Sequence, residues 1–167
     1  MNPAPLLLIL AILATPALAD ENIYHYLEKI DDHHNVVVGL NGKSGDSLAA
    51  STIVVWLATD KKIDIDIVVE NHISPKESNI LVGHPCGNSL VQLSCDNWPY
   101  DQGTGIIRVM GEDLIISGTT TDDIALAAKA ITAYKQHAIL RTTDFVTVHN
   151  DNGNIIDSLE NRLNYRT

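Results

Sequence analysis

The chain has 167 residues, a length that suits one compact domain with a hydrophobic core of its own. It carries 11 Lys and Arg against 21 Asp and Glu, which gives a net charge of -10 at pH 7. Such a surface repels phosphate backbones and anionic lipid headgroups, so the composition argues against nucleic-acid binding and against membrane docking through a basic patch. Cations and basic protein surfaces match this charge better. We expect no resident cofactor, although loose binding of divalent cations fits the acidity.

The first 19 residues have the pattern of a secretory signal peptide. An apolar run, LLLILAILA, extends from Leu6 to Ala14, and Pro16 ends it. Ala17-Leu18-Ala19 then supplies the small-x-small pattern that signal peptidase accepts. The run is too short to cross a bilayer, which needs roughly 20 apolar residues. We therefore predict that residues 1–19 are removed and that a secreted domain covers residues 20–149, with no transmembrane segment in the mature chain.

The first half of the mature chain has three apolar segments. Helical spacing predicts a short amphipathic helix over 21–30, and NVVVGL from Asn35 predicts a strand. The next segment, SLAASTIVVWLA from Ser47, is apolar nearly all round. Its β-branched residues favour a strand, but its length and alanine content favour a buried helix, which is the structure we predict. IDIDIVVE from Ile63 alternates apolar and acidic residues, as in a strand with one wet face at or near a sheet edge.

The middle of the chain continues with NILVG from Asn79, predicted as a strand, and a short helix from Asn88 toward Leu93. A loop that contains Cys, Asp, Trp and Pro then extends through Tyr100. Two strands follow, over 105–110 and 113–118. Only Gly111-Glu112 separates them, and so tight a link predicts an antiparallel hairpin.

The helix that begins at Thr120 or Thr121 is the best-specified element. Either threonine can cap it, and Asp122 and Asp123 place carboxylates at its positive end. One apolar stripe follows at helical spacing: Ile124, Ala127, Ala128, Ile131 and Tyr134. DFVTVH from Asp144 predicts a closing strand, and the polar tail 150–167 is compatible with a short helix. The whole pattern predicts an α/β fold: one domain with a mostly parallel sheet, flanking helices and one antiparallel hairpin.

Several of these segments, taken in order, resemble the α/β module of archaeal S-layer proteins and related exported archaeal proteins. The resemblance is carried by NVVVGL, ILVGHPCGNSLV, GIIRV and LIISGTTTDDIALAAKAITAY, and it covers most of the span from Asn35 to Val148. His84 stands where that family usually has a second glycine, and the chain is far shorter than lattice-forming relatives. The resemblance implies a structural role in the cell envelope, with the chain itself or other envelope proteins as partners.

The two cysteines, Cys86 and Cys95, allow two interpretations. In an exported protein thiols tend to oxidise, and the spacing of nine favours a disulfide between them. Some exported proteins of the resembled family have a cysteine pair in this region. Alternatively, Cys86 at a helix start is an activated thiolate with His84 or His137 as its base, as in a Cys-dependent hydrolase.

Three functions therefore remain open. The first is a non-catalytic envelope protein that acts through self-association or surface contacts. The second is an extracellular module that binds a glycan or peptide at the carboxyl ends of the parallel strands, the usual ligand crevice of open α/β sheets. The third is the exported Cys-dependent hydrolase. No metal site is predicted, and the residues expected at the crevice are His84, Asn88, Trp98, Tyr100, Thr119, Thr120 and Thr121.

Overall fold

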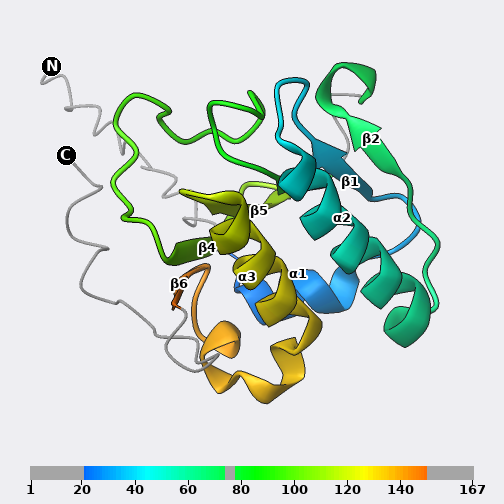
Figure 1. Cartoon of the computed structure of the whole chain (residues 1–167). Helices are drawn as coiled ribbons and strands as arrows, with labels where there is room; N and C mark the ends of the chain where they lie inside the picture. Colours follow the sequence, from blue (N-terminus) through cyan, green and yellow to red (C-terminus); the bar gives the residue numbers. More distant parts are fainter. Residues whose placement is uncertain (1–20, 74–77, 150–167) are drawn as a thin grey trace, which may run out of the picture.

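The computed structural model describes residues 21–73 and 78–149. Within that part, six strands form one sheet in the order β2-β1-β3-β5-β4-β6 (Figure 1). The strands are β1 (Asn35–Val38), β2 (Ile67–Val69), β3 (Asn79–Val82), β4 (Thr104–Met110), β5 (Asp113–Gly118) and β6 (Phe145–His149). β2, β1, β3 and β5 are parallel, whereas β4 pairs antiparallel with both β5 and β6. The predicted fold class and hairpin are confirmed.

Helices α2 (Ser44–Trp56) and α3 (Thr121–Thr132) pack beside each other across one face of this sheet (Figure 1). Strand side chains that point toward them are fully buried, as alternation along a strand requires. They include Val36, Ile80, Ile107, Leu114 and Ile116. The opposite face carries a much smaller cluster built on Val37, Leu81, Val91 and Ile115. The main core therefore lies between the sheet and the helices.

Helix α1 (Ile23–Lys29) forms where the sequence predicts it and lies near the amino end of β3. The Tyr26 hydroxyl donates hydrogen bonds to the carbonyl oxygens of Asn79, at 3.0 Å, and Glu112, at 3.2 Å. These bonds attach α1 to the end of the sheet opposite to the one at which β1, β3 and β5 finish.

Helix α3 confirms the prediction made from its cap. Thr120 is the N-cap residue, and its hydroxyl accepts a hydrogen bond from the Asp123 amide at 3.3 Å. Tyr134 is buried as expected, but it lies beyond the helix, in the 3-10 turn Tyr134–Gln136.

Helix α2 also forms, but two expectations about it are wrong. It begins at Ser44 rather than at Ser47, because Asp46 accepts a hydrogen bond from the Lys43 amide at 3.0 Å and so organises an earlier first turn. It is not buried all round either: Leu48 and Val55 are 67% and 60% exposed. After Trp56 the chain continues into a π turn, Leu57–Lys61.

The helix expected from Asn88 toward Leu93 does not form, and the chain makes turns there instead. The Asn88 side chain accepts a hydrogen bond from the Leu90 amide at 3.2 Å, a local bond that competes with helix formation.

The strand expected over 63–70 is confined to β2. Its partner strand, β1, is short, and β2 pairs with it only through Ile67, Val68 and Val69. The position at the edge of the sheet is as predicted. The predicted signal peptide, 1–19, and the tail, 150–167, lie outside the described residues.

Candidate functional site

The carboxyl ends of the parallel strands meet at one edge of the sheet. β1, β3 and β5 end at Val38, Val82 and Gly118, and the segments that follow them lie along this edge (Figure 1). The topological switch point of the sheet lies between β1 and β3. From β1 the chain continues to β2 on one side, and from β3 it continues to β4 and β5 on the other side. Open α/β sheets usually bind ligands at such a point.

The space between the segments after β1 and β3 is closed by backbone packing. A Cβ atom added to Gly39 would lie 1.9 Å from the Gly87 carbonyl oxygen and 2.4 Å from the Asn88 Cα. The Asn41 amide also donates a hydrogen bond to the Gly87 carbonyl at 3.2 Å. The two segments touch through atoms that no side-chain motion can move apart, so they leave no crevice for a ligand between β1 and β3.

Asn88, expected as a ligand-binding group, has a structural role instead. Its side chain is fully buried, and its amide nitrogen donates to the carbonyl oxygens of Val37, at 3.2 Å, and Val82, at 3.1 Å. Both acceptors lie within the paired parts of the two strands, so these bonds tie Asn88 to the carboxyl ends of β1 and β3. Asn88 therefore holds the crevice shut.

Glu70 completes this closure and was not identified from the sequence. One carboxylate oxygen accepts from the Leu40 amide at 3.0 Å, and the other accepts from the Ser89 amide at 2.6 Å and hydroxyl at 2.8 Å. Burial of the carboxylate raises the pKa of Glu70, but the hydrogen bonds from Leu40 and Ser89 outweigh this effect and lower the pKa below its ordinary value. No sequence pattern signals these contacts, because the partners lie 30 and 19 residues away.

Four half-buried rings form what we call the aromatic row, defined by His84, Trp98, Tyr100 and Phe145. Ring centroids are 4.8 Å apart between His84 and Trp98, 5.0 Å between Trp98 and Tyr100, and 6.2 Å between Tyr100 and Phe145. Thr119 fixes the middle of the row, because its hydroxyl accepts from the Trp98 indole at 2.9 Å and donates to the Tyr100 carbonyl at 2.8 Å. The structure thus brings together four of the predicted crevice residues: His84, Trp98, Tyr100 and Thr119.

Thr120 and Thr121, also expected at the crevice, support helix packing. Thr120 caps α3, and Thr121 packs so closely against Gly45 of α2 that a Cβ atom at Gly45 would lie 2.4 Å from the Thr121 Cβ and 2.7 Å from its Cγ2. They position α2 and α3 against each other rather than a ligand.

His84 presents one ring nitrogen as a hydrogen-bond donor. Its Nδ1 atom accepts from the Cys86 amide at 3.1 Å, which assigns the proton of the neutral ring to Nε2. Burial, and secondarily the charge of Lys43, lower the pKa of His84 below its ordinary value of 6.5. The ring is therefore neutral at pH 7.

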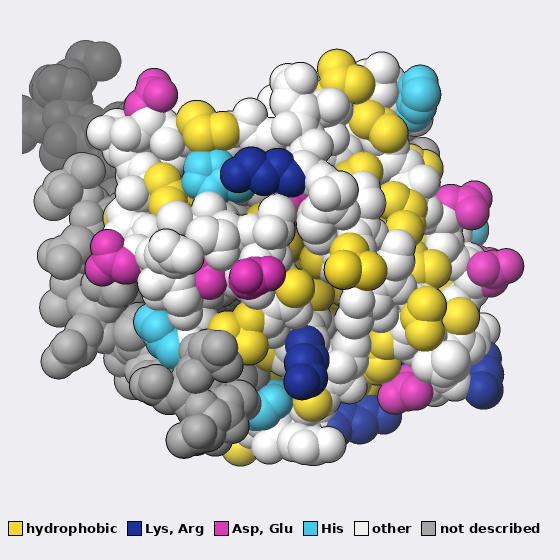
Figure 2. Space-filling view, in the orientation of Figure 1, with side chains coloured by type: hydrophobic (Ala, Val, Ile, Leu, Met, Phe, Trp, Pro, Cys, Tyr) yellow, Lys and Arg dark blue, Asp and Glu magenta, His cyan; other side chains and the backbone are white. Residues whose placement is uncertain are grey.

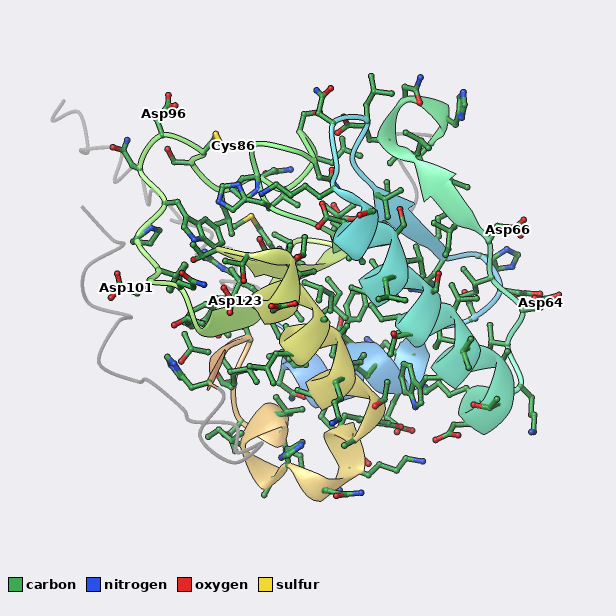
Figure 3. The ribbon with its side chains drawn as sticks, in the orientation of Figure 1. Asp64, Asp66, Cys86, Asp96, Asp101 and Asp123 are labelled. Carbon is green, nitrogen blue, oxygen red and sulfur yellow. A yellow bond between two sulfur atoms is a disulfide. The ribbon has the colours of Figure 1, made fainter. Side chains whose placement is uncertain are left out.

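Cys86 and Cys95 form a disulfide with a Cα–Cα distance of 5.0 Å, the pairing expected from the sequence. The bond closes the first part of the loop that carries Trp98 and Tyr100, from which Asp96 and Asp101 project outward (Figure 3). A disulfide of this kind indicates an oxidising environment. In this state Cys86 has no thiol, so the hydrolase hypothesis lacks its nucleophile.

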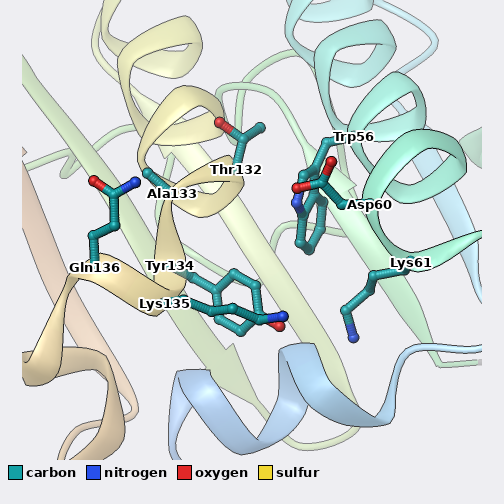
Figure 4. A pocket seen from close by; sticks show the side chains of 8 residues that line it. All are labelled: Trp56, Asp60, Lys61, Thr132, Ala133, Tyr134, Lys135 and Gln136. Atoms are coloured by element: carbon teal, nitrogen blue, oxygen red, sulfur yellow. The ribbon is translucent and has the colours of Figure 1, made fainter.

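A small hollow lies at the other end of the helices, between the π turn after α2 and the turn after α3 (Figure 4). Its volume is about 150 Å³, below the roughly 300 Å³ at which ligand pockets begin. Trp56 and Tyr134 meet edge to face there, with ring centroids 5.6 Å apart, and the Tyr134 hydroxyl donates to the Glu28 carboxylate. Burial, and secondarily this bond, raise the pKa of Tyr134. These contacts fasten the helix ends together.

The second candidate surface lies on the outer side of helix α2. We define the α2 outer face by five residues at helical spacing on the side of α2 away from the sheet, and by one residue of the π turn that follows: Ser44, Leu48, Ser51, Thr52, Val55 and Thr59. Hydrophobic side chains gather over α2 and β2 on the right of Figure 2. The exposed large apolar residues of these two elements are Leu48 and Val55 of α2 and Ile67 of β2, which is 39% exposed. From Ser44 to Thr59 the only charged residue is Asp46, and it is buried.

Two further observations concern the described residues alone. Across 21–73 and 78–149, no group of three or more His, Cys, Asp or Glu side chains is placed to hold a metal ion. No helix in that part of the chain is both long enough and apolar enough to cross a membrane.

Comparison with known proteins gives little beyond this geometry. No family model matches the sequence, and no curated protein matches it. A solved structure titled "Structure of CpGH84D" is similar with a TM-score of 0.43 and 16% sequence identity. The match covers 68% of this chain and only 19% of that one. At this score and identity, nothing about the activity of the present chain follows.

Proposed function

We propose that this protein is an exported, non-catalytic component of the cell envelope, similar in role to S-layer subunits, which acts through contacts between its outer surface and neighbouring subunits. The observation that carries the proposal is the α2 outer face. Leu48 and Val55 are exposed on the same side of a helix whose other side already covers the sheet, and apolar side chains that gather on a surface in this way mark sites of contact with other molecules.

The disulfide supports the exported part of the proposal. Cys86 and Cys95 are oxidised, as expected for a protein that works outside a reducing cytoplasm. Secretion through residues 1–19 and a location at the cell envelope are the finer steps of the proposal, and the sequence patterns given above support them.

The closed crevice supports the non-catalytic part. Backbone packing between Gly39 and Gly87, together with the Asn88 side chain, fills the position where open α/β sheets usually bind small substrates. The hollow beside Trp56 and Tyr134 is too small to replace it. Contact through exposed surfaces therefore suits this geometry better than chemistry inside a cavity.

Size-exclusion chromatography with light scattering on the mature chain, residues 20–167, tests the proposal with and without calcium. We expect a mass above that of a monomer which rises with protein concentration. Calcium should increase it further if divalent cations bridge the acidic surfaces of neighbouring copies. A monomer at every concentration, unaffected by calcium, would contradict self-association.

The aromatic row supports a second candidate function, the binding of a glycan or peptide. Half-buried Trp98 and Tyr100 rings beside a neutral His84 donor resemble the mix of flat apolar faces and directed polar groups found in ligand sites. Trp56→Phe leaves Trp98 as the single tryptophan, so a fluorescence titration with neutral oligosaccharides such as cellohexaose reports on the row alone. Saturable quenching that Tyr100→Ala weakens would favour this function, and an unchanged spectrum would count against a glycan ligand.

A further inference from the structure

We propose that the α2 outer face binds the same face of a second copy of this chain, with the two α2 helices antiparallel about a two-fold axis between Ser51 and Thr52. This inference rests on the proposed function and names the partner and the surface that self-association uses.

The two exposed apolar side chains of the face are placed for such pairing. Leu48 and Val55 are seven residues apart, which is close to two helical turns, so they project from the same side of α2. The midpoint between their sequence positions falls between Ser51 and Thr52. A two-fold axis there places Leu48 of each copy opposite Val55 of the other, which makes the interface isologous.

The lack of exposed charge on this face favours it for contact between identical copies. Two chains that each carry -10 repel, and the repulsion is least where neither exposes a charged side chain. The α2 outer face meets that condition over its whole length, since Asp46 is buried and Asp60 comes after its last residue.

Three hydroxyl groups of the face have internal partners, which lowers the cost of removing water from it. Ser51, Thr52 and Thr59 donate to the carbonyl oxygens four residues earlier, at 2.8, 3.0 and 2.8 Å. Burial of these three hydroxyl groups therefore leaves none of their protons unpaired. Ser51 and Thr52 are also small enough at the proposed axis to let the two helices approach to about 8–10 Å.

The neighbouring sheet edge is a weaker place for copies to meet. β2 is an edge strand and offers unpaired backbone groups, but Asp64 and Asp66 just before it are exposed and project outward (Figure 3). Two copies joined through β2 would bring these carboxylates together, and charges at an edge are a common means of preventing strand addition. Pairing through α2 avoids this contact.

The size of the face predicts weak association. The 13 residues of α2 extend about 20 Å, and a strip about 10 Å wide on each copy gives roughly 400 Å² in all. This is below the roughly 1,000 Å² that a stable specific interface needs. The dimer should therefore form reversibly at high protein concentration and gain strength when further contacts hold many copies together.

Cross-linking tests the geometry directly. Thr52→Cys places a thiol beside the proposed axis, and Asp122→Cys places one on the exposed side of α3 as a control. Under mild oxidation, we expect Thr52→Cys to form a covalent dimer at least about tenfold faster than Asp122→Cys at equal concentration. Equal rates for the two variants would overturn the proposed axis.

Sedimentation equilibrium on variants that carry an added negative charge tests whether the dimer forms through this face. Val55→Glu and Leu48→Glu should each raise the dimer dissociation constant about tenfold or more, since each puts two carboxylates into one symmetric interface. Gln102→Glu adds the same charge to an exposed loop and should leave the constant nearly unchanged. Association that persists in both α2 variants would refute this inference while the proposed function stands, whereas a wild-type monomer at all concentrations refutes both.

Discussion

Helices α2 and α3 cover the same face of the sheet, yet their outer sides differ. α3 exposes Asp122 and Lys129 and buries its apolar stripe, so its pattern is explained by contact with the sheet alone. α2 buries one side in the same core but leaves Leu48 and Val55 exposed on the other. Packing within this domain therefore explains the apolar residues of α3, but it explains only those on the buried side of α2.

The two helices also differ at their amino ends, although each has an aspartate three residues after its N-cap. Asp123 accepts from the Gly103 amide at 3.0 Å and from the Thr120 amide and hydroxyl at 2.9 and 2.8 Å. Asp46 accepts from the Lys43 amide through Oδ2, while its buried Oδ1 has no hydrogen-bond partner in the described part of the chain. The N-cap side chain of α3 accepts a hydrogen bond from an amide of the first turn, whereas Lys43 at the N-cap of α2 makes no such bond.

The largest effect should come from Gly105→Ala, which breaks the packing of α3 on β4. A Cβ atom there would lie 2.4 Å from the Asp123 carbonyl oxygen and 3.0 Å from the Ala127 Cβ, so the helix must move away. We expect a loss of about 3 kcal/mol in the free energy of unfolding, measured by urea denaturation. Ser47→Ala, on the exposed side of α2, serves as the control. A loss below about 1 kcal/mol would mean that α3 can shift on β4 without cost.

A smaller effect should separate the two helix caps. Thr120→Ala removes the hydroxyl that accepts from Asp123 and should destabilise the domain by about 1 kcal/mol. Lys43→Ala is the matched change at the N-cap of α2, and it should have little effect because a lysine side chain has no acceptor for a helix amide. Thermal unfolding of both variants checks the difference. Equal losses of stability in the two variants would show that Thr120 and Lys43 contribute alike as N-cap residues.

Local signals explain why much of the fold could be predicted. The cap at Thr120, the stripe from Ile124 to Ile131 and the tight link at Gly111 each act within a few residues, so the sequence predicts α3 and the hairpin correctly. The turn from Asn88 was mispredicted because the Asn88 side chain, besides its local bond with the Leu90 amide, donates to carbonyl oxygens of β1 and β3. Such a partner cannot be identified from neighbouring residues.

The same reason limits prediction of the site. The disulfide was identified because Cys86 and Cys95 are the two cysteines of the chain, and the rings at Trp98 and Tyr100 follow them in the same loop. Glu70 was missed because its partners at Leu40 and Ser89 become neighbours only when the sheet is formed. The all-round apolar pattern of α2 correctly predicted a helix, but it also predicted that the helix is buried on all sides. A sequence pattern does not distinguish a helix buried by its own chain from one buried by a second chain.

The smallest effect we expect, from Asp46→Asn, concerns the pH dependence of stability. Burial raises the pKa of Asp46, and the Lys43 amide bond and the charge of Lys43 offset this effect in part. The folded state then holds the Asp46 proton more tightly than the unfolded state, whose aspartates have pKa values near 3.9. This contribution to stability is complete below about pH 4 and is lost as the pH rises through the folded-state pKa.

Asp46→Asn removes that titration and keeps an oxygen to accept from Lys43. The variant should therefore be more stable than the wild type at pH 7 and equal to it near pH 3, as measured by urea unfolding across that range. Asp101→Asn, a change at an exposed loop position, controls for the loss of one negative charge. A constant difference between Asp46→Asn and wild type at every pH would show that Oδ1 finds a partner in solution, and the contrast between the two helix ends would then disappear.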